Sequence, residues 1–297
     1  MSSSPRSLTG LEILQTGPQC LVEDLGRPGR AGEGVTISGA VDRRSYLQGN
    51  RLVGNEIGAP AIEVLLGGLT VRPARDAVVA VTGAWCPVTI DDSPVSFGTP
   101  LLVRAGSVLR LGHPEHGLRS YLAVRGGVIP TGEFGGSWST DTSSGIGPAP
   151  VRAGDNLPVG NRVARQPLIG EVPPAVPAGD ELTLRLTLGP RPKLLGAEAH
   201  EALTRRFGDI SAHSDRIGIR LNGFDLAAPP GDGASQALPL GAVQAPRGGE
   251  LIVFHVDHPT TGGYPVIGVV HGEDLDLLAQ CGPGRRVRFA VRPAPSY

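Results

Sequence analysis

The densest group of polar side chains in the sequence spans residues 255–265, His-Val-Asp-His-Pro-Thr-Thr-Gly-Gly-Tyr-Pro. If this segment begins as a strand, His255 and Asp257 share one face and His258 lies on the opposite face, because side chains alternate along a strand. Two histidines and a carboxylate could hold a metal ion, but this spacing suits one ion poorly. We therefore predict no metal site.

The second part of this segment offers a different chemistry. The hydroxyls of Thr260 and Thr261 and the amides of Gly262 and Gly263 could form a concave set of donors, next to Tyr264, for a carboxylate, a phosphate or an oxyanion. A β-turn that carries polar side chains and binds nothing explains the same residues. The sequence leaves both interpretations open.

Another polar group combines Ser214, Asp215 and Arg216 with Gln244, which lies upstream of the Thr-Gly-Gly residues. The guanidinium of an arginine presents a planar pair of donors that can hold a carboxylate. Asp215 beside Arg216 could equally form a structural ion pair. A substrate-binding role and a structural role both remain possible.

In the N-terminal half, Arg27, Asp42 and Asn55 lie among glycines, which suggests a polar pocket wall. Asp42 also precedes a predicted helix and is a plausible N-cap. The serines of the Ser137–Asp141 segment lack the G-x-S-x-G pattern of a nucleophile elbow, so we do not predict a nucleophilic serine.

These side chains must be positioned mainly by strands. Short apolar or alternating runs bounded by Gly, Pro or Asp predict strands at 11–14, 64–66, 69–71, 78–82, 88–90, 101–103, 108–111, 182–188, 251–254, 266–270 and 287–291. Helices are predicted over 42–53, stopping at Gly54-Asn55, over 194–207, and near 273–280. Gly106, Gly154 and Gly284 each begin a turn that leads into a strand, where we expect positive φ.

Composition supports a mainly β fold. The chain has 44 Gly and 28 Pro among 297 residues, and these are the residues that helices tolerate least and turns use most. Hydrophobic residues make up 40% and the net charge is −1, which excludes a disordered chain. A Pro-rich segment at 167–180 predicts a linker between an N-terminal unit, 1–166, and a C-terminal unit, 181–297.

Charge and residue usage exclude several function classes. A near-neutral chain without a basic run lacks the footprint of a nucleic-acid binder, and no apolar stretch is long enough to span a membrane. Lys193 is the single lysine, which removes a P-loop and a Met-Lys biotin attachment site. No signal-peptide pattern is present, and three distant cysteines suit reduced thiols, so we expect a cytoplasmic protein.

Eight phrases occur in order along the chain: Glu23-Asp-Leu-Gly-Arg27, Ser38-Gly-Ala-Val-Asp42, Asn50-Arg-Leu-Val-Gly-Asn55, Tyr121-Leu-Ala-Val-Arg-Gly-Gly127, Ser137-Trp-Ser-Thr-Asp141, Ser214-Asp-Arg-Ile-Gly218, Gly241-Ala-Val-Gln244 and Thr260-Thr-Gly-Gly-Tyr-Pro265. Together they resemble the allophanate hydrolase subunit 2 family, also described as the biotin-dependent carboxyltransferase-domain, KipA-like or PxpC-like family. The phrases extend over most of the sequence.

The resemblance implies two cyclophilin-like β-barrel units with a few short helices. It implies a homologous subunit 1, KipI-like or PxpB-like, as partner, with a third large subunit in some assemblies and a small-molecule amide as substrate. ATP or carboxybiotin would be used by the complex and bound mainly by partner subunits, with no cofactor attached covalently to this chain.

The resemblance favours a subunit of an ATP-dependent 5-oxoprolinase, a hydrolase that opens the 5-oxoproline lactam to glutamate. The alternatives are a carboxyltransferase subunit of a biotin-dependent urea-degrading system and a non-catalytic KipA-type regulatory protein. In the enzymatic cases, Thr260, Thr261 and the following glycine amides would stabilise negative charge on an amide or acyl-phosphate oxygen. Arg216 would hold a substrate carboxylate, and Asp257 or Asp42 would orient it.

Three positions depart from the usual family pattern: Glu23 stands for Gln, Ile217 for Met and Trp138 for Arg. The exchange at 217 conserves an apolar side chain. Trp138 removes a cation and Glu23 adds an anion, so a pocket built at those positions would bind anionic substrates less well.

Overall fold

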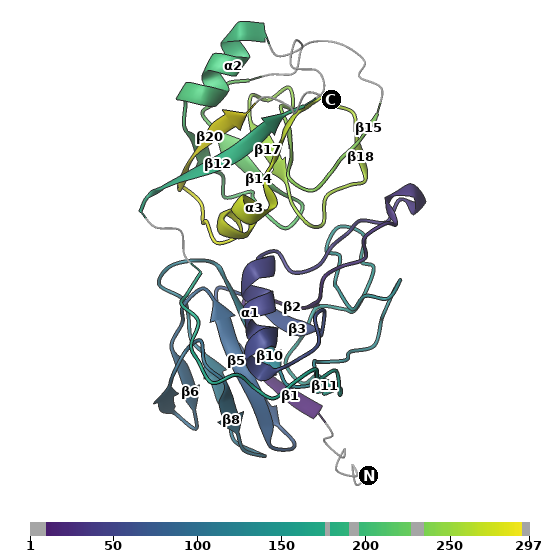
Figure 1. Cartoon of the computed structure of the whole chain (residues 1–297), viewed down its shortest axis with the longest axis vertical. Helices are drawn as coiled ribbons and strands as arrows, with labels where there is room; N and C mark the ends of the chain where they lie inside the picture. The colour runs from purple at the N-terminus through teal and green to yellow at the C-terminus, as the bar shows by residue number, and fades with distance from the viewer. Residues whose placement is uncertain (1–9, 176–178, 190–195, 227–234, 293–297) are drawn as a thin grey trace. The chain divides into compact units, whose positions relative to one another are not determined.

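The computed structural model describes residues 10–175, 179–189, 196–226 and 235–292 (Figure 1). The chain divides into two compact units. The first comprises Met1–Gly26, Arg43–Thr140 and Ile146–Val176, and the second comprises Arg27–Asp42, Asp141–Gly145 and Pro177–Tyr297. The main boundary between the units falls within the predicted linker. However, two short segments of the N-terminal half belong to the second unit, whereas the predicted units are each one continuous range.

The first unit is built from eleven strands and one long helix in its described part. Its elements are β1 (Gly10–Gln15), β2 (Gln19–Glu23), α1 (Arg43–Val53), β3 (Ala61–Leu65), β4 (Thr70–Pro73), β5 (Ala77–Gly83), β6 (Val88–Ile90), β7 (Ser93–Val95), β8 (Leu101–Val103), β9 (Leu109–Leu111), β10 (Arg119–Val124) and β11 (Asn156–Pro158). The strands form a six-stranded sheet, in the order β11-β1-β4-β9-β6-β7, and a five-stranded sheet, β2-β3-β10-β5-β8.

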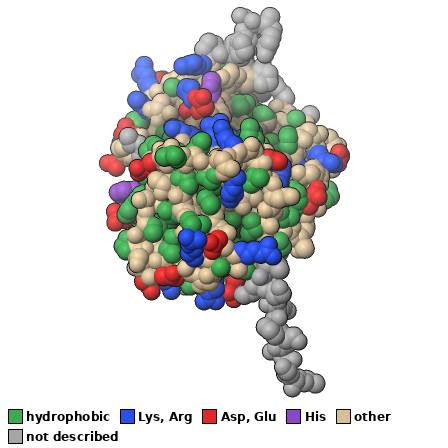
Figure 2. Space-filling view, turned by 60° about the horizontal axis from the view of Figure 1, so that its bottom comes forward, with side chains coloured by type: hydrophobic (Ala, Val, Ile, Leu, Met, Phe, Trp, Pro, Cys, Tyr) green, Lys and Arg blue, Asp and Glu red, His purple; other side chains and the backbone are tan. Residues whose placement is uncertain are grey.

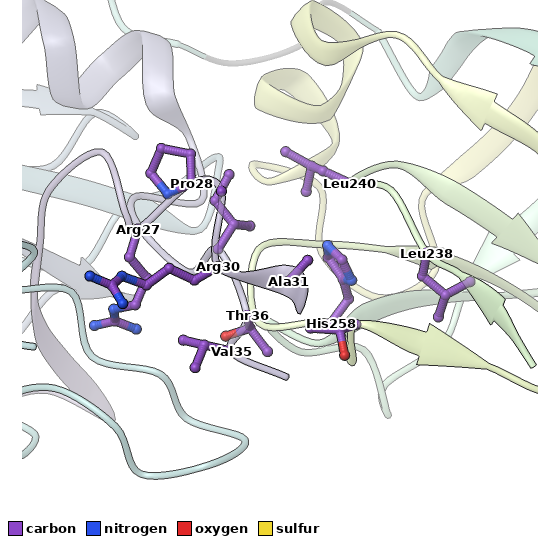
Figure 3. Close-up of a pocket in the computed structure, with 12 residues that line it drawn as sticks. Arg27, Pro28, Arg30, Ala31, Val35, Thr36, Leu238, Leu240 and His258 are labelled. Atoms are coloured by element: carbon purple, nitrogen blue, oxygen red, sulfur yellow. The ribbon is translucent and has the colours of Figure 1, made fainter. Parts of the chain in front are cut away.

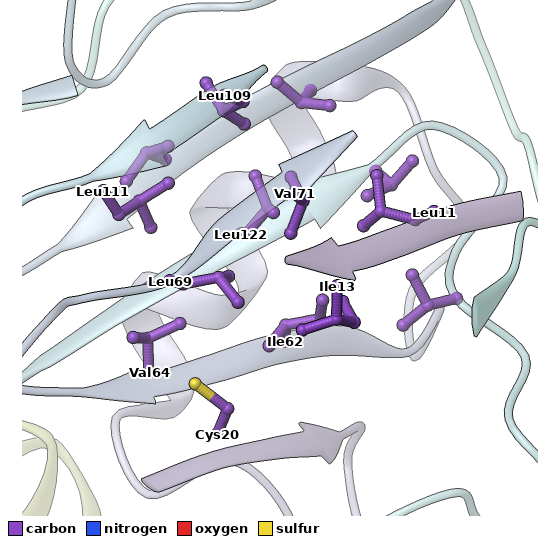
Figure 4. Close-up of a cluster of buried hydrophobic side chains, with 14 of the residues drawn as sticks. Leu11, Ile13, Cys20, Ile62, Val64, Leu69, Val71, Leu109, Leu111 and Leu122 are labelled. Carbon is purple, nitrogen blue, oxygen red and sulfur yellow. The ribbon is translucent and has the colours of Figure 1, made fainter. Parts of the chain in front are cut away.

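The core of the first unit lies between these two sheets. Side chains from β1, β4 and β9 of one sheet meet side chains from β2, β3 and β10 of the other, as Figure 4 shows for a set that includes Leu11, Ile13, Cys20, Ile62, Val64, Leu69, Val71, Leu109, Leu111 and Leu122. All of these are almost completely buried. The strands of this unit therefore form two sheets that enclose one core.

Helix α1 packs against β5 and β10 of the five-stranded sheet (Figure 1). Gly49 permits the close approach, because a Cβ there would lie 3.0 Å from Thr82 Oγ1 and 3.2 Å from Ala123 Cβ. The Thr82 hydroxyl donates a hydrogen bond to the Ser45 carbonyl at 2.7 Å. The helix ends before Gly54, which has φ +75°, so the predicted stop is confirmed.

The second unit contains a closed barrel. Its elements are a 3₁₀ turn (Ala31–Glu33), β12 (Glu181–Leu188), α2 (Gly196–Arg205), β13 (Gly208–Ile210), β14 (Gly218–Asn222), β15 (Gln236–Ala237), β16 (Ala242–Gln244), β17 (Leu251–Phe254), β18 (Thr261–Gly262), β19 (Val266–Val270), α3 (Gly272–Leu278) and β20 (Arg286–Arg292). Seven strands close in the order β12-β19-β16-β17-β14-β13-β20, with β12 and β20 parallel. Strands β15 and β18 form a separate pair.

The alternating pattern at 182–188 does form a half-buried strand. Leu182, Leu184 and Leu186 point into the barrel core, and the residues between them are exposed or half-buried. The predicted turn glycines at 106, 154 and 284 have φ of +81°, +91° and +81°, so that prediction is confirmed. Strands β2, β7, β10, β13, β14, β15, β16 and β18 were not predicted, because their apolar runs are short or lack alternation.

The described part of the predicted linker follows the first unit. The amides of Leu168, Val172 and Ala175 donate to the carbonyls of Leu52, Gly98 and Gly83, respectively, at 2.9 Å each. Residues 176–178 lie outside the described residues. Most of the Pro-rich segment is thus hydrogen-bonded to the first unit and is not a linker without contacts.

Charge is mixed on the surface. On the face drawn in Figure 2, arginine side chains and acidic side chains alternate with apolar ones, in keeping with the net charge of −1. Across the described ranges, no helix combines the length and the apolar character that a bilayer-spanning segment requires.

Burial makes the three cysteines poor nucleophiles. Cys20, Cys86 and Cys281 are free thiols, and burial raises the pKa of each to about 11. Because the thiolate is the reactive form, we expect native protein at pH 8 to react only slowly with a disulfide reagent such as dithiobis(nitrobenzoate). In denaturant all three thiols should react at once, and rapid modification of the native chain would contradict this assignment.

Candidate functional site

The Asp257 carboxylate accepts a cluster of hydrogen bonds within the second unit. Arg216 donates to it through Nε at 2.8 Å and through Nη2 at 3.3 Å, and Nη2 also donates to the Gly39 carbonyl at 2.8 Å. The Ser38 hydroxyl donates to Oδ1 at 2.8 Å, and the amide and hydroxyl of Thr142 donate to Oδ2 at 3.0 and 2.7 Å. Asp257 thereby joins three stretches of chain that are distant in sequence.

The ion pair between Arg216 and Asp257 is buried, with side-chain exposures of 2% and 0%. Burial alone would raise the pKa of the Asp257 carboxyl, but the Arg216 charge and the hydrogen bonds from Arg216 and Thr142 outweigh it and hold the pKa below its ordinary value of 3.8. The structure thus places Arg216 against Asp257 and a backbone carbonyl, not at a surface open to a substrate carboxylate.

Other predicted site residues also form internal contacts. Asp42 is buried and accepts a hydrogen bond from Gln280 Nε2 at 2.7 Å. Ser214 Oγ accepts from the Arg220 amide at 3.0 Å, and Asp215 Oδ1 accepts from the amides of Ile217 and Gly218. Ser214 and Asp215 therefore shape the loop that leads into β14.

The Thr-Gly-Gly residues lie beside Gln244. Gln244 Nε2 donates to the Tyr264 carbonyl at 2.6 Å, and a Cβ on Gly262 would lie 2.9 Å from that nitrogen. Thr261 and Gly262 form β18, while Thr261, Gly263 and the Tyr264 side chain are exposed. The contact with Gln244 accounts for the glycine at 262 without a ligand.

Asn55 belongs to the first unit, apart from the other predicted site residues. Its Nδ2 donates to Asn50 Oδ1 and to the Val124 carbonyl, and its Oδ1 accepts from the Gly126 amide at 2.7 Å. The amide of Gly127 donates to the Val124 carbonyl at 2.8 Å. This side chain therefore supports a turn, and both glycine amides are used within the protein.

The Ser137–Asp141 segment is likewise held by carboxylates. Asp24 accepts from Ser137 Oγ and Ser139 Oγ at 2.6 Å each and from the Trp138 amide at 2.8 Å. In the second unit, Asp141 accepts from the Thr36 hydroxyl at 2.6 Å. These contacts give the two serines a structural role, as expected in the absence of a nucleophile elbow.

A pocket of about 190 Å³ lies within the second unit (Figure 3). One wall comes from the 27–42 segment and includes Arg27, Arg30, Ala31, Val35 and Thr36; the other comes from loops of the barrel and includes Leu238, Leu240, His258 and Thr260. Of the predicted site residues, Arg27 and Thr260 therefore lie at this pocket. Because the 27–42 segment is far from the barrel in sequence, sequence reasoning did not combine these two walls.

Sequence reasoning missed three polar side chains that line the pocket, those of Arg30, Thr36 and His258. His258 is the buried titratable group among these three. It is 5% exposed, and its Nδ1 lies 2.7 Å from the Pro259 carbonyl. Burial lowers the pKa of the imidazole below its ordinary value of 6.5, against smaller opposing effects of the Pro259 carbonyl and the Asp257 charge. The sequence signal for this position was that His258 directly follows Asp257, so that along a strand the two side chains lie on opposite faces.

His255 has a different environment. Its Nδ1 accepts from the Val256 amide at 3.0 Å, and its Nε2 faces the Leu275 carbonyl at 3.4 Å. Across the described ranges, no group of three or more His, Cys, Asp and Glu side chains could hold a metal ion.

Comparison with known proteins places this arrangement in a family. Residues 33–291 match the family described as carboxyltransferase domain, subdomain A and B. The chain belongs to this carboxyltransferase-domain family. It is 37% identical over 284 residues to the C subunit of 5-oxoprolinase from Escherichia coli and 34% identical to the Haemophilus influenzae protein of the same name, covering 94% of this chain and 90% of each relative.

Solved structures share the fold of this chain. The Kluyveromyces lactis urea amidolyase superposes with a TM-score of 0.85 at 25% identity, over 97% of this chain. The match covers 19% of the amidolyase chain. This family domain is therefore one part of a much longer polypeptide in the amidolyase.

Proposed function

We propose that this chain is a subunit of an ATP-dependent hydrolase of the 5-oxoprolinase type. The observation that carries the proposal is the similarity, over most of both sequences, to two proteins that are named as the C subunit of 5-oxoprolinase. In the net reaction, water adds across the lactam C–N bond of 5-oxoproline. The carbonyl carbon becomes a carboxylate, the ring nitrogen becomes the amine of glutamate, and ATP is hydrolysed to ADP and phosphate.

The same proposal assigns partners to the chain. The names of both relatives describe them as one subunit among several, and in urea amidolyase the domain is joined to further sequence. We infer a homologous subunit 1 and a third large subunit, with ATP bound mainly by these partners. The use of ATP and the three free thiols fit a cytoplasmic assembly.

The predicted catalytic residues take different parts in this proposal. Thr260 lines the pocket and can donate a hydrogen bond to a carbonyl oxygen of a substrate. Asp257 acts as a positioning residue, since it binds Ser38 and so holds the segment that forms one pocket wall. Thr261 is exposed beside the pocket-lining Thr260, where it could face a partner subunit.

A second candidate function is a carboxyltransferase subunit of a biotin-dependent urea-degrading system. The structural similarity to urea amidolyase favours it. The lower identity to that protein, 25% against 37% for the 5-oxoprolinase relative, makes it the alternative.

Reconstitution tests these functions. The chain, its subunit 1 and the third subunit should together hydrolyse ATP only when 5-oxoproline is present, with one glutamate formed per ADP. Carboxyl transfer from a biotinylated partner to urea would support the alternative instead. Binding of subunit 1 without turnover of either compound would contradict both and indicate a KipA-type regulatory protein.

A further inference from the structure

His258 is held in one orientation at the wall of the pocket. Its backbone amide donates to the His255 carbonyl at 3.1 Å, which closes a turn directly after β17. Its ring packs against Phe254, with 6.3 Å between the ring centroids, and its Nδ1 lies 2.7 Å from the Pro259 carbonyl. These contacts fix the direction in which the other ring nitrogen, Nε2, points.

The same contacts determine which nitrogen of His258 carries a proton. A carbonyl oxygen only accepts a hydrogen bond, so Nδ1 is the protonated nitrogen. Burial holds the pKa of the ring below its ordinary value of 6.5, so at pH 7 the ring is neutral and Nε2 has a lone pair. Among the described residues Nε2 has no hydrogen-bond partner, yet it is not one of the partnerless side-chain atoms that are sealed from solvent. Solvent therefore reaches this lone pair.

Thr260 supplies a second open polar group at the pocket. Its carbonyl accepts from the Leu238 amide at 3.0 Å, which anchors its backbone. Its hydroxyl forms no hydrogen bond within the part of the chain that the structure describes, so it can donate to a bound molecule. The Thr36 hydroxyl on the facing wall already donates to Asp141 at 2.6 Å. The pocket thus offers one open acceptor, His258 Nε2, and one open hydroxyl.

The imidazole is also the proton acceptor of the pocket. No aspartate or glutamate is among the described residues of its walls. The charged groups that line the pocket or adjoin the ring are Arg27, Arg30, which pairs with Glu33 at 2.9 Å, and Asp257, which precedes His258 in the chain. A guanidinium remains protonated and cannot take up a proton, so within these walls proton transfer at neutral pH falls to His258.

We propose that His258 acts as the general base of amide hydrolysis in this pocket, with the Thr260 hydroxyl as donor to the carbonyl oxygen. This inference rests on the proposed function and deepens it, because it assigns the proton acceptor of the lactam step to this chain. Figure 3 shows the imidazole of His258 turned toward Ala31 and Leu240, which line the same pocket.

Proton transfer through Nε2 accounts for every atom that water adds to the amide. The water oxygen bonds to the carbonyl carbon, the π electrons of the C=O bond move to its oxygen beside the Thr260 hydroxyl, and one water proton passes to His258 Nε2. When the C=O bond re-forms, the C–N bond breaks, and the nitrogen keeps the electron pair and takes the proton from the imidazolium. The neutral base is thereby restored.

The size of the pocket leaves ATP hydrolysis to another site. An apolar cavity of about 150 Å³ holds a molecule as large as benzene, whereas pockets for drug-sized ligands measure about 300–1,000 Å³. A pocket of about 190 Å³ therefore accommodates a small ring but not a nucleotide. His258 accordingly acts on the lactam and not on the phosphates of ATP.

The test measures kcat and the KM for 5-oxoproline and for ATP in the assembly reconstituted with its partner subunits. His258→Asn keeps a donor near the position of Nδ1 and removes Nε2. Its kcat should fall about 100-fold or more, the usual contribution of proton transfer to a positioned side chain. Both KM values should change by less than about threefold, because a base contributes to the transition state rather than to ground-state binding.

The pH dependence distinguishes a base from a residue that only supports the fold. Only the neutral imidazole accepts a proton, so wild-type kcat should be constant above the pKa of His258 and fall as the pH decreases through it, below pH 6.5. The residual rate of His258→Asn should lack this acid limb. Added imidazole should restore part of the rate of His258→Ala, whose short side chain leaves space in the pocket.

A second position keeps the test independent of the folding of His258 variants. Thr260 is half-buried, and Thr260→Val preserves its shape while removing the hydroxyl, so kcat should fall about 100-fold. Thr260→Ser should restore most of the rate. His213→Asn is the matched control, because His213 is an exposed histidine of the same unit that does not line the pocket, and kcat and the acid limb should both be unchanged.

The outcomes separate this inference from the proposed function. If the wild-type assembly hydrolyses 5-oxoproline and folded His258→Asn keeps its kcat and its acid limb, the assignment of His258 is wrong and the proposed function stands. If the assembly leaves 5-oxoproline intact but hydrolyses another amide with an acid limb that His258→Asn removes, the general base stands and the proposed function is wrong. An assembly that hydrolyses no amide overturns both.

Discussion

Replacing Asp257 with alanine should lower the free energy of unfolding by about 3–5 kcal/mol, the usual cost of removing one partner from a buried ion pair. Arg216, with a side chain 2% exposed, would lose the carboxylate with which it pairs, and the donors of Ser38 and Thr142 would lose their acceptor. Urea denaturation at pH 7 measures the change. Because three distant stretches meet at this carboxylate, the variant should also lose protection from proteolysis in the 27–42 segment.

A matched control distinguishes burial from ion pairing as such. Glu181 pairs with Arg286 at 2.9 Å in the same unit, but both side chains are about half exposed. Glu181→Ala should therefore cost at most about 1 kcal/mol. Equal effects of the two substitutions would show that the Asp257 cluster contributes no more than a surface contact.

The effect of Asp257→Ala should depend on pH in a defined direction. The folded-state pKa of Asp257 lies below its ordinary value of 3.8, so the carboxylate stabilises the fold fully above that value. This stabilisation is lost as pH falls through the folded pKa. The difference in stability between wild type and variant should thus be constant from pH 7 to about pH 5 and shrink below about pH 4. A difference that grew on acidification would contradict the assigned ionisation.

Gly126→Ala should strongly destabilise the first unit, with a cost of about 2–5 kcal/mol from backbone strain and overpacking together. Gly126 has φ +97°, and a Cβ there would lie 2.1 Å from the Gly160 carbonyl oxygen. The turn cannot move away easily, because the Gly126 amide also donates to Asn55 Oδ1. Thermal unfolding of the purified variant measures the loss.

Gly154→Ala is the control for this substitution. Gly154 has a similar φ, +91°, in the same unit, but nothing lies within 4 Å of an added Cβ. It should show only the cost of the unfavourable φ, about 1–2 kcal/mol. If the two variants were equally stable, the contact with Gly160 would carry no weight.

Local features of the fold were readable from the sequence because their causes are local. Alternation at 182–188 directs one face of β12 toward the core, and Gly54 ends α1 where a left-handed residue is expected. The positive φ of Gly106, Gly154 and Gly284 follows from turn chemistry alone. The ordered phrases also suffice to indicate the family that residues 33–291 match.

The candidate site could be predicted only in part. Thr260 and Arg27 do line the pocket, but the spacing of His258 pointed only to a poor metal site, and a contiguous division leaves the 27–42 wall in the N-terminal unit. Arg216 and Asp257 are candidate substrate-facing groups by residue type, whereas the structure pairs them with each other. The residue types indicated polar chemistry, but they did not indicate which polar groups form hydrogen bonds or ion pairs with one another.

The sequence by itself determined a mainly β chain, its turns, its helix ends and its family, because these depend on side-chain periodicity and backbone preference within a few residues. Tertiary structure decided which segments share a unit and which polar groups are left to face a ligand. Asp257 meets Ser38 across 219 positions and Thr142 across 115, and no local pattern specifies such pairings. Burial then pairs the Arg216 and Asp257 side chains with each other, whereas His258 and Thr260 line a pocket.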